Sequence, residues 1–506
     1  MNLDLNGTMA RRWIRIAAWS MVAALSTLKF CYLTADFPND SMWMIDQAKF
    51  TDEGWWANAA VRHFLTGHWN VPGDYNPAAA LPIWPLLLST VFHFTGVSVV
   101  AARALNVAIS IGTLAVVFAL VRRYASAGSE APALLAVLLL AASPFAFVFN
   151  RLAILDTLVV FEFCLLMLVA SFASARRVWP LAAITILVTT IMLTKTTAAV
   201  LLPAVFWIFW WAMGRRFAGM ARALLAVVVL PALLLSGYSA LVSALGYGID
   251  FHYFFNVNAS PEIDWRQTLA TLREFFHDCL WIDRILYPAG LVILFLTAAW
   301  KRKLWSNPLF SASWIILGAQ AVFIFTRQDD FAPRYYLAML APLIWIVTLT
   351  LCELITHSRK GAALLLIVIT ASVALNVAMV GQFLTHRDFD FHNAALSIRN
   401  IIRDHPEQNA LILGVSGNQL SLMAGIPSIN DGYGTEDMTA KVASYQPGWY
   451  VAWNDVSLKD QEFLSAYQLE EMASYPAFDD DDRGALTLYR MVRKTGSAPD
   501  SPAGLP

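Results

Sequence analysis

Long apolar segments separated by short polar connections make up most of the chain before residue 385. A helix needs roughly 20 apolar residues to cross a bilayer. The first run covers 16–33, and others lie near 99–121, 133–150, 156–173, 178–194, 197–213, 222–245, 284–300, 309–326, 335–356 and 361–383. The pattern predicts an all-α polytopic membrane domain with about eleven transmembrane helices.

Clusters of basic residues fall in every second connection between these segments. They are Arg11-Arg12, Arg122-Arg123, Arg176-Arg177, Arg215-Arg216, Lys301-Arg302-Lys303 and Arg359-Lys360. Because cytoplasmic connections are rich in Lys and Arg, the N-terminus is predicted to be cytoplasmic and the first span a retained signal anchor. A bacterial inner membrane fits this topology, with the C-terminal residues in the periplasm.

Composition agrees with a membrane protein. Of 506 residues, 58% are hydrophobic and only 14% are charged, against about a quarter in soluble domains. The lipid bilayer is therefore an expected partner, and no nucleic acid is expected. The four cysteines have no spacing typical of metal ligands or of a disulfide framework, and we interpret them as small buried side chains.

The first predicted outer loop, 35–98, is unusually polar and aromatic. At its centre Asp52-Glu53 precede Trp55-Trp56. Helical periodicity predicts one helix over 55–67 and a second over 81–94, both lying along the membrane surface.

From about residue 385 the composition becomes that of a soluble protein. We predict a membrane domain over 1–384 and a small periplasmic α/β domain over 385–506. It should contain a helix at 391–403, strands at 410–415 and 449–453, and an edge strand at 486–492. Gly414 to Gly417 match no phosphate-binding fingerprint, and 479–482 resemble a solvated turn more than a calcium loop.

Four polar groups on the predicted outer face could carry chemistry. Asp52 and Glu53 either cap a helix or act on a substrate, with Asp52 accepting a proton from an acceptor hydroxyl. Arg151 and Asp156 either pair with each other or line a site. Lys195, in an otherwise apolar run, either snorkels or binds a phosphate.

The fourth group is Arg334 with Tyr335, which fits either an interfacial belt or recognition of a lipid phosphate. Carboxylates in one loop and cations in three others suit transfer from a lipid phosphate. The cations would stabilise the leaving phosphate, and a carboxylate would act on the incoming hydroxyl.

Several short motifs, taken in chain order, resemble those of the GT-C glycosyltransferases. The likeness is strongest to the dolichyl-phosphate-mannose protein mannosyltransferase and aminoarabinose transferase superfamily. The resemblance covers about 12–350. It rests on Asp52-Glu53, Asn76-Pro77, Ala101-Ala102-Arg103, the segment 151–156, Leu193-Thr194-Lys195, and Arg334-Tyr335-Tyr336 followed by Pro342.

The resemblance implies a glycosyltransferase that moves a sugar from a polyprenyl-phosphate donor to a periplasmic lipid, glycan or protein acceptor, with inversion. Asp52 would match the family's catalytic aspartate, with Glu53 beside it. The substrates would be bound by Trp55, Trp56, Asn76, Arg151, Asp156, Lys195, Arg334 and Tyr335.

Two departures from the family pattern bear on this implication. Asn76 stands where members often have His, and Trp55-Trp56 where Arg or Tyr is common. Metal ligands are therefore unassigned, and a divalent cation stays an open question. Two alternatives remain: a secondary transporter that uses Lys195 and Asp156, and a non-catalytic scaffold of the cell envelope.

Overall fold

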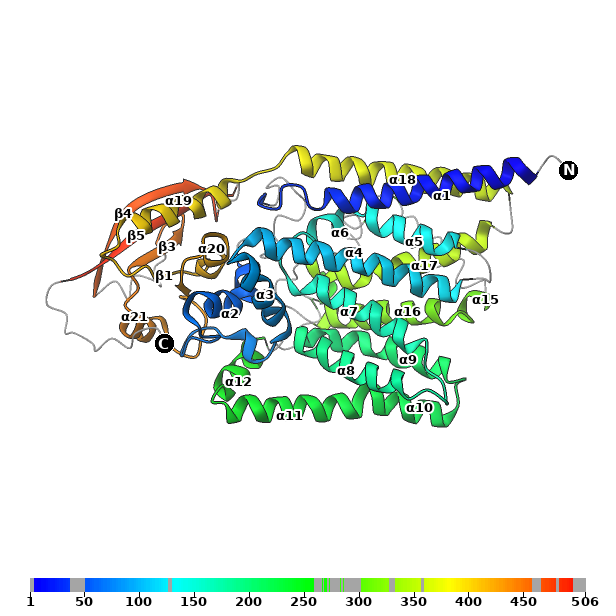
Figure 1. Cartoon of the computed structure of the whole chain (residues 1–506), viewed down its shortest axis with the longest axis horizontal. Coiled ribbons are helices and arrows are strands. Elements are labelled where there is room, and N and C mark those ends of the chain that lie inside the picture. The colour runs from blue at the N-terminus through cyan, green and yellow to red at the C-terminus, as the bar shows by residue number, and fades with distance from the viewer. Residues whose placement is uncertain are drawn as a thin grey trace.

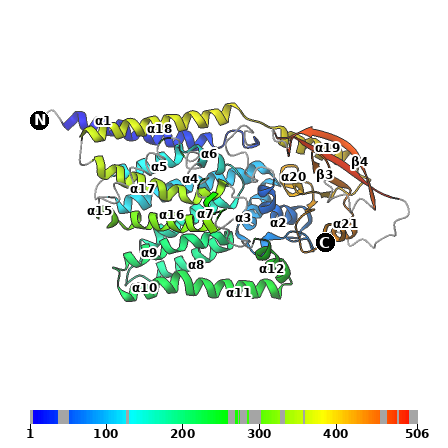
Figure 2. The same ribbon diagram turned by 180° about the vertical axis from the view of Figure 1, so that it is seen from behind.

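The computed structural model describes residues 4–36, 51–125, 130–258, 302–326, 333–355, 359–456, 466–478 and 482–494, with a few isolated positions between 266 and 285. A bundle of roughly parallel and antiparallel helices forms one end of the molecule, and a mixed α/β region forms the other (Figure 1). The reverse view shows the same two parts, with helices α2 (Asp52–Thr66) and α3 (Ile83–Thr95) between them (Figure 2).

The bundle is built mainly from apolar helices. Its described members are α1 (Asp4–Leu28), α4 (Val99–Tyr124), α5 (Ala131–Ala142), α6 (Pro144–Phe149), α7 (Leu155–Ala170), α8 (Trp179–Thr194), α9 (Leu202–Ala212), α10 (Phe217–Leu224), α11 (Leu230–Ala244), α12 (Gly248–Val257), α15 (Arg302–Trp305), α16 (Pro308–Thr326), α17 (Leu337–Ile355) and α18 (Arg359–Thr385). A short π-helical stretch, Leu225–Val229, joins α10 to α11.

Four helical segments of the described chain are long and apolar enough to cross a membrane. They are Val99–Tyr124, Phe217–Ala244, Pro333–Glu353 and Leu366–Thr385. Shorter apolar helices, such as α5 and α8, occupy other predicted spans. The predicted span near 284–300 lies outside the described residues, apart from Ile285, so the count of eleven remains a prediction.

One predicted span is broken within its length, and two others are separated at the position that the sequence predicted. The segment 133–150 is split at Ser143-Pro144, because proline cannot donate the backbone hydrogen bond that would continue α5. Ser143 then caps α6 by accepting a hydrogen bond from Ala146 N at 3.2 Å. The run 178–213 is interrupted at Lys195, after which a 3₁₀ turn (Thr196–Leu201) leads into α9.

The C-terminal region contains a five-stranded mixed sheet in the order β2-β1-β3-β5-β4. Its strands are β1 (Ile412–Leu413), β2 (Ser428–Ile429), β3 (Trp449–Trp453), β4 (Tyr467–Pro476) and β5 (Ala485–Arg493). The predicted helix at 391–403 is confirmed as α19 (Asp390–Asp404), and the strand at 449–453 as β3. The expectation that 486–492 forms an edge strand is wrong, because β5 pairs with β3 on one side and β4 on the other.

The sheet separates two hydrophobic layers because side chains alternate along β3. Trp449 and Val451 face α19 and α20 (Gly417–Ala424). Tyr450 and Ala452 pack in the opposite layer with Val442 of α21 (Met438–Tyr445). The first layer also includes apolar residues of α2 and α3, so the C-terminal region and the first loop share one core.

Polar contacts strengthen this junction between the loop and the C-terminal region. Gly54 N donates to Gln419 Oε1 at 2.6 Å, and the Trp55 indole donates to Val415 O at 3.3 Å. Asp74 accepts from Asn430 N at 3.1 Å and from Lys441 Nζ at 3.2 Å. The Gly414–Gly417 turn therefore lies at an internal interface.

The close approach of α2 to α20 depends on a glycine. A Cβ at Gly54 would overlap the backbone of Asn418 and Gln419. We expect Gly54→Ala to lower the thermal midpoint markedly, at a cost of about 1–3 kcal/mol or more from overpacking. Differential scanning fluorimetry in detergent would measure it, with Gly237→Ala, where a Cβ meets open space, as the control. An equal effect of both substitutions would contradict this account of the junction.

Candidate active site

The site begins at the first turn of α2, where Asp52 and Glu53 are both buried. The predicted helix is confirmed, although it starts at Asp52 rather than Trp55. Consecutive helical residues project about 100° apart, so the two carboxylates have different neighbours. Thr51 provides no side-chain cap to the helix.

Asp52 forms an ion pair with Arg334, a residue distant in sequence. The distance between Asp52 Oδ2 and Arg334 Nη2 is 2.5 Å. The hydroxyl of Thr51 donates to Asp52 Oδ1 at 3.3 Å. Arg334 lies in a 3₁₀ turn (Pro333–Tyr336) immediately before α17, so the start of α17 meets the start of α2.

Lys195 and Asp156 form a second ion pair near Arg334. Lys195 Nζ lies 2.7 Å from Asp156 Oδ1 and 4.5 Å from the centre of the Tyr335 ring, while the Arg334 guanidinium lies 5.5 Å from the same ring. Asp156 is in the first turn of α7 and Lys195 follows the last turn of α8. Each charge therefore complements its helix dipole.

These contacts settle which residues Asp156 and Lys195 pair with. Asp156 pairs with Lys195, so the suggested pairing of Arg151 with Asp156 is wrong. Lys195 has a carboxylate partner within the protein, so simple snorkelling does not describe it. Four segments that are remote in sequence thus bring two carboxylates and two cations around Tyr335.

Glu53 is held by contacts to three other segments. Arg103 donates to it from Nε at 2.8 Å and from Nη2 at 2.6 Å. Ala153 N donates at 2.7 Å and Gln419 Nε2 at 3.0 Å. The network joins the first loop to α4, to the corner between α6 and α7, and to the C-terminal region.

The same corner is held from a second position on α4. Asn106, one turn after Arg103, donates to the carbonyl oxygens of Leu152 and Ile154, the latter at 2.9 Å. We predicted Arg103 only as part of a family motif, and Gln419 was not singled out. An isolated cation and an amide one turn apart, in the apolar run 99–121, are the signal that could have identified the α4 contacts.

Asn76 occupies a buried turn of the first loop. Its side-chain amide donates to Val71 O at 2.8 Å and to Asp250 Oδ1 at 2.9 Å. Its oxygen accepts from Val71 N at 3.1 Å and from Arg62 Nη1 at 3.0 Å. These bonds support a structural role in shaping the loop.

An aromatic cluster lies beside the carboxylates. The Trp55 ring is 5.6 Å from Tyr75 and 5.0 Å from Tyr433, measured between ring centres. Tyr433, from the C-terminal region, remains 37% exposed. Burial raises the pKa of Tyr75, and the nearby charge of Asp52 adds to this effect. Trp56 is partly buried and packs against both the bundle core and the core shared with the C-terminal region.

Arg151 lies on the other side of the corner. Its Nη2 donates to Cys31 O at 2.6 Å and to Tyr32 O at 2.9 Å. Burial, followed by repulsion from Arg103, lowers its pKa to about 10. Arg151 is therefore near the Glu53 network, but it lies apart from the pair formed by Lys195 and Asp156.

No cluster of three or more His, Cys, Asp or Glu side chains suited to a metal ion occurs among the described residues. Residues 479–481, part of the segment that we interpret as a solvated turn, lie outside the described residues. Among the described cysteines, Cys31, Cys164 and Cys352 are free thiols, of which Cys164 is buried and the other two are partly buried.

Asp36 is a titratable group between the bundle and the C-terminal region. Its backbone pairs with Asp388. Burial raises the pKa of its carboxyl from 3.8 to about 7. The positive charge of Arg103 and a backbone hydrogen bond from His392 oppose this shift, whereas the negative charges of Asp388 and Glu53 add to it. The folded protein therefore binds this proton more tightly than the unfolded chain.

Asp36→Asn should change the pH dependence of stability. Stability of the wild type should fall as pH rises from about 4 to about 7, because the folded state loses a proton that the unfolded state has already released. We expect the variant to have a higher thermal midpoint at pH 8 and a similar one at pH 4. Melting curves across this range, with Asp404→Asn as an exposed control, would test it. A constant difference at all pH values would contradict the assignment.

Known membrane glycosyltransferases resemble this chain in sequence and in fold. Residues 77–238 match the model of the dolichyl-phosphate-mannose-protein mannosyltransferase family. ArnT from Cupriavidus metallidurans, in its crystal structure bound to undecaprenyl phosphate, superposes with a TM-score of 0.63 at 15% identity, covering 95% of this chain and 98% of ArnT. In sequence over residues 77–238, and in fold over nearly its whole length, the chain resembles membrane glycosyltransferases of the GT-C type.

The GT-C resemblance predicted from the sequence is thus confirmed. The Archaeoglobus fulgidus oligosaccharyltransferase, in a complex with Zn and sulfate, also matches, with a TM-score of 0.54 at 12% identity over 94% of this chain and 73% of that one. No curated protein matches the sequence significantly. At these identities the structural likenesses establish the fold, and roles of individual residues must be argued from the site.

Proposed function

We propose that this protein transfers a sugar from a polyprenyl-phosphate-linked donor to an acceptor hydroxyl at the outer face of a bacterial inner membrane. The observation that carries the proposal is the convergence of Asp52, Arg334 and Lys195 around Tyr335. A carboxylate close to two cations suits a reaction in which a hydroxyl loses a proton and a phosphate gains negative charge.

In the proposed step the acceptor oxygen attacks the anomeric carbon while the bond from that carbon to the phosphate oxygen breaks. Asp52 accepts the hydroxyl proton. The polyprenyl phosphate leaves with the electron pair of the broken bond, and Arg334 and Lys195 stabilise its charge. Direct displacement of this kind inverts the anomeric configuration.

The surroundings of the site support a carbohydrate and a lipid. Trp55 and Tyr433, which pack against the buried Tyr75, offer ring faces and edges for sugar contacts beside Asp52. The ArnT structure with the same fold contains undecaprenyl phosphate, which is the product expected after transfer from a bacterial polyprenyl donor. Glu53 fits a positioning role, since it makes four hydrogen bonds within the protein.

The direct test is turnover by the purified protein in lipid nanodiscs. Labelled polyprenyl-phosphate pentoses and hexoses would be supplied with lipid, glycan and peptide acceptors, in the presence of Mg²⁺, Mn²⁺ or EDTA. We expect release of polyprenyl phosphate and a product whose anomeric configuration, read by NMR, is inverted. Retention of configuration would contradict the single displacement. Uptake of donor or ions into proteoliposomes without turnover would favour a transporter that uses Lys195 and Asp156.

A further inference from the structure

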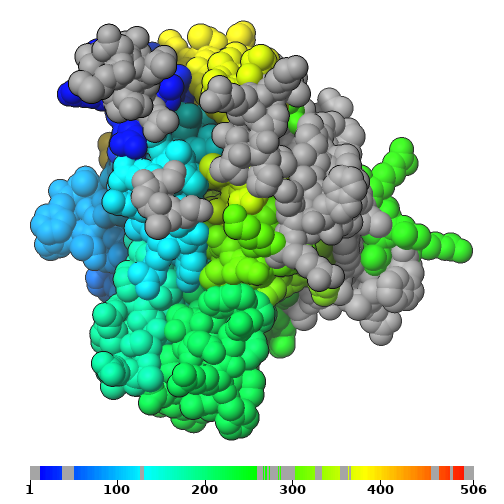
Figure 3. Space-filling view, turned by 90° about the vertical axis from the view of Figure 1, so that its right-hand side faces the viewer, coloured from blue at the N-terminus to red at the C-terminus, as the bar shows by residue number. Residues whose placement is uncertain are grey.

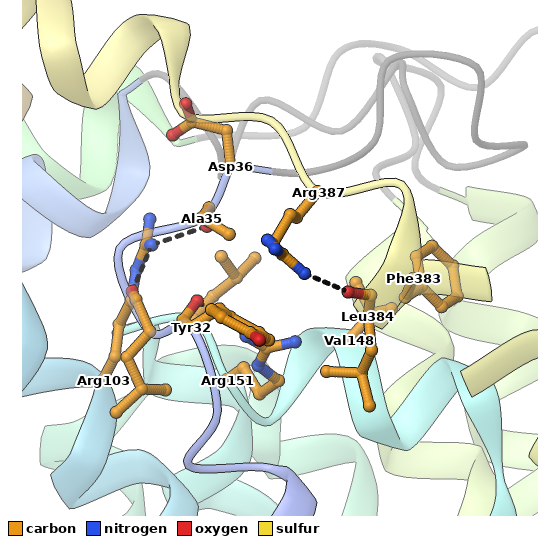
Figure 4. Close-up of a pocket in the computed structure, with 11 residues that line it drawn as sticks. Tyr32, Ala35, Asp36, Arg103, Val148, Arg151, Phe383, Leu384 and Arg387 are labelled. Atoms are coloured by element: carbon orange, nitrogen blue, oxygen red, sulfur yellow. Dashed lines mark hydrogen bonds between the residues drawn. The ribbon is translucent and has the colours of Figure 1, made fainter. Parts of the chain in front are cut away.

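A pocket that Asp52 does not line lies where α18 and the segment after α1 approach the C-terminal region (Figure 4). Its walls come from the segment after α1, the start of α4, the corner after α6 and the end of α18. None of Asp52, Lys195, Arg334 or Tyr335 lines it. In the end-on view α1 and α18 lie next to each other along one edge of the bundle (Figure 3).

Three arginines reach this pocket, and only one of them has a carboxylate partner among the described residues. Arg103 is neutralised by Glu53. Arg151 donates to carbonyl oxygens and lies 5.1 Å from the Phe147 ring centre. Arg387 donates to Leu384 O at 3.1 Å and lies 4.1 Å from the Tyr32 ring centre. Arg151 and Arg387 thus present two positive charges around Tyr32 (Figure 4).

Asp36 is the one carboxylate among the described residues that line the pocket, and it does little to offset these charges. Asp36 points away from the space between Arg151 and Arg387 (Figure 4). Because burial raises its pKa to about 7, a large fraction of Asp36 is neutral near physiological pH. The pocket is therefore net positive and suits an anion.

The surroundings indicate which anion this is. Phe383, Leu384 and Val148 line the pocket beside the arginines. Along the bundle, α1 and α18 expose apolar side chains, including Trp19 and Leu375. A phosphate attached to acyl chains would satisfy both surfaces, with its oxygens on the guanidinium groups and its chains along the helices.

We propose that this pocket binds the phosphodiester of an anionic glycerophospholipid, held by Arg151 and Arg387. Such a lipid would fasten the ends of α1 and α18 where the Asp36–Asp388 bridge connects the bundle to the C-terminal region. The site is distinct from the donor site proposed around Asp52. It serves assembly of the two parts and does not depend on catalysis.

The test uses full-length protein in detergent with added lipid, and the main variant is Arg387→Ala, because Arg387 is exposed. Native mass spectrometry and thermal melting would compare phosphatidylglycerol, phosphatidylcholine, undecaprenyl phosphate and inorganic phosphate. We expect phosphatidylglycerol to bind and raise the melting temperature. Its affinity should fall about fivefold or more in Arg387→Ala. Arg222→Ala is the matched control, since Arg222 is an exposed arginine that donates to Ala175 O at 3.0 Å.

The proposal fails if Arg387→Ala binds phosphatidylglycerol as tightly as wild type, or if Arg222→Ala weakens binding equally. It also fails if phosphatidylcholine binds as well as phosphatidylglycerol, because the phosphate would then be recognised without regard to net charge. Tighter binding of undecaprenyl phosphate or of free phosphate would overturn the assignment to a glycerophospholipid. Arg151→Gln, which keeps hydrogen-bond donors but loses charge, should weaken binding by a similar factor.

Discussion

Asp52→Asn is expected to slow sugar transfer by at least about a hundredfold, the lower end of the range for losing a general base. The amide has the size of the carboxylate but cannot accept the proton of an acceptor hydroxyl. Initial rates at saturating and at low donor concentration would measure the effect. We expect kcat to fall while KM for the donor changes little, because the proton moves only in the chemical step.

Controls must separate this loss from damage to the fold. Asp52→Asn leaves Arg334 beside a neutral amide, so its melting temperature has to be compared with that of the wild type. Asp404→Asn is the matched carboxylate control, because Asp404 is an exposed aspartate in the last turn of α19. An Asp52→Asn variant that is folded and fully active would contradict the assignment of Asp52 as base.

The apolar pattern predicted most helices of the bundle, because the hydrophobicity and the helical periodicity of a segment depend only on residues that are close in sequence. The corner at 150–156 and the break at Lys195 were visible for the same reason: a polar or charged group interrupts an apolar run. A break without a charged residue is harder to predict: Ser143-Pro144 lies inside the predicted span 133–150, where proline stands among apolar and small residues.

Pairings across the chain could not be predicted. Nothing near Asp52 or Lys195 in sequence indicates that Arg334 and Asp156 are their partners, since these contacts arise from helix packing. The position of β5 inside the sheet was missed because β4 carries polar residues on an exposed edge, and its sequence gives little hydrophobic alternation. The docking of α20 on Gly54 likewise depends on a long-range contact.

Substitution of Glu53 is expected to have the second large effect, which is a loss of folding stability rather than of the chemical step. Glu53→Ala would leave the Arg103 guanidinium buried without its carboxylate, and would remove the acceptor for Ala153 N and Gln419. Breaking a buried ion pair from one side typically costs about 3–5 kcal/mol. We expect a large drop in melting temperature and faster proteolysis between α18 and the C-terminal region.

Glu53→Gln separates positioning from catalysis. The glutamine oxygen can still accept from Ala153 N or Arg103, so the variant should fold, with a smaller loss of stability than Glu53→Ala. If Glu53 only positions the loop, its transfer rate at a temperature well below the melting point should stay within about tenfold of the wild type, far from the hundredfold loss expected for a general base. A folded Glu53→Gln protein with a hundredfold lower kcat would show instead that Glu53 acts in the reaction. Substitution of Asp52 should therefore lower kcat, because Asp52 contacts Arg334 at the site. Substitution of the adjacent Glu53 should lower stability, because Glu53 joins α4 to the C-terminal region.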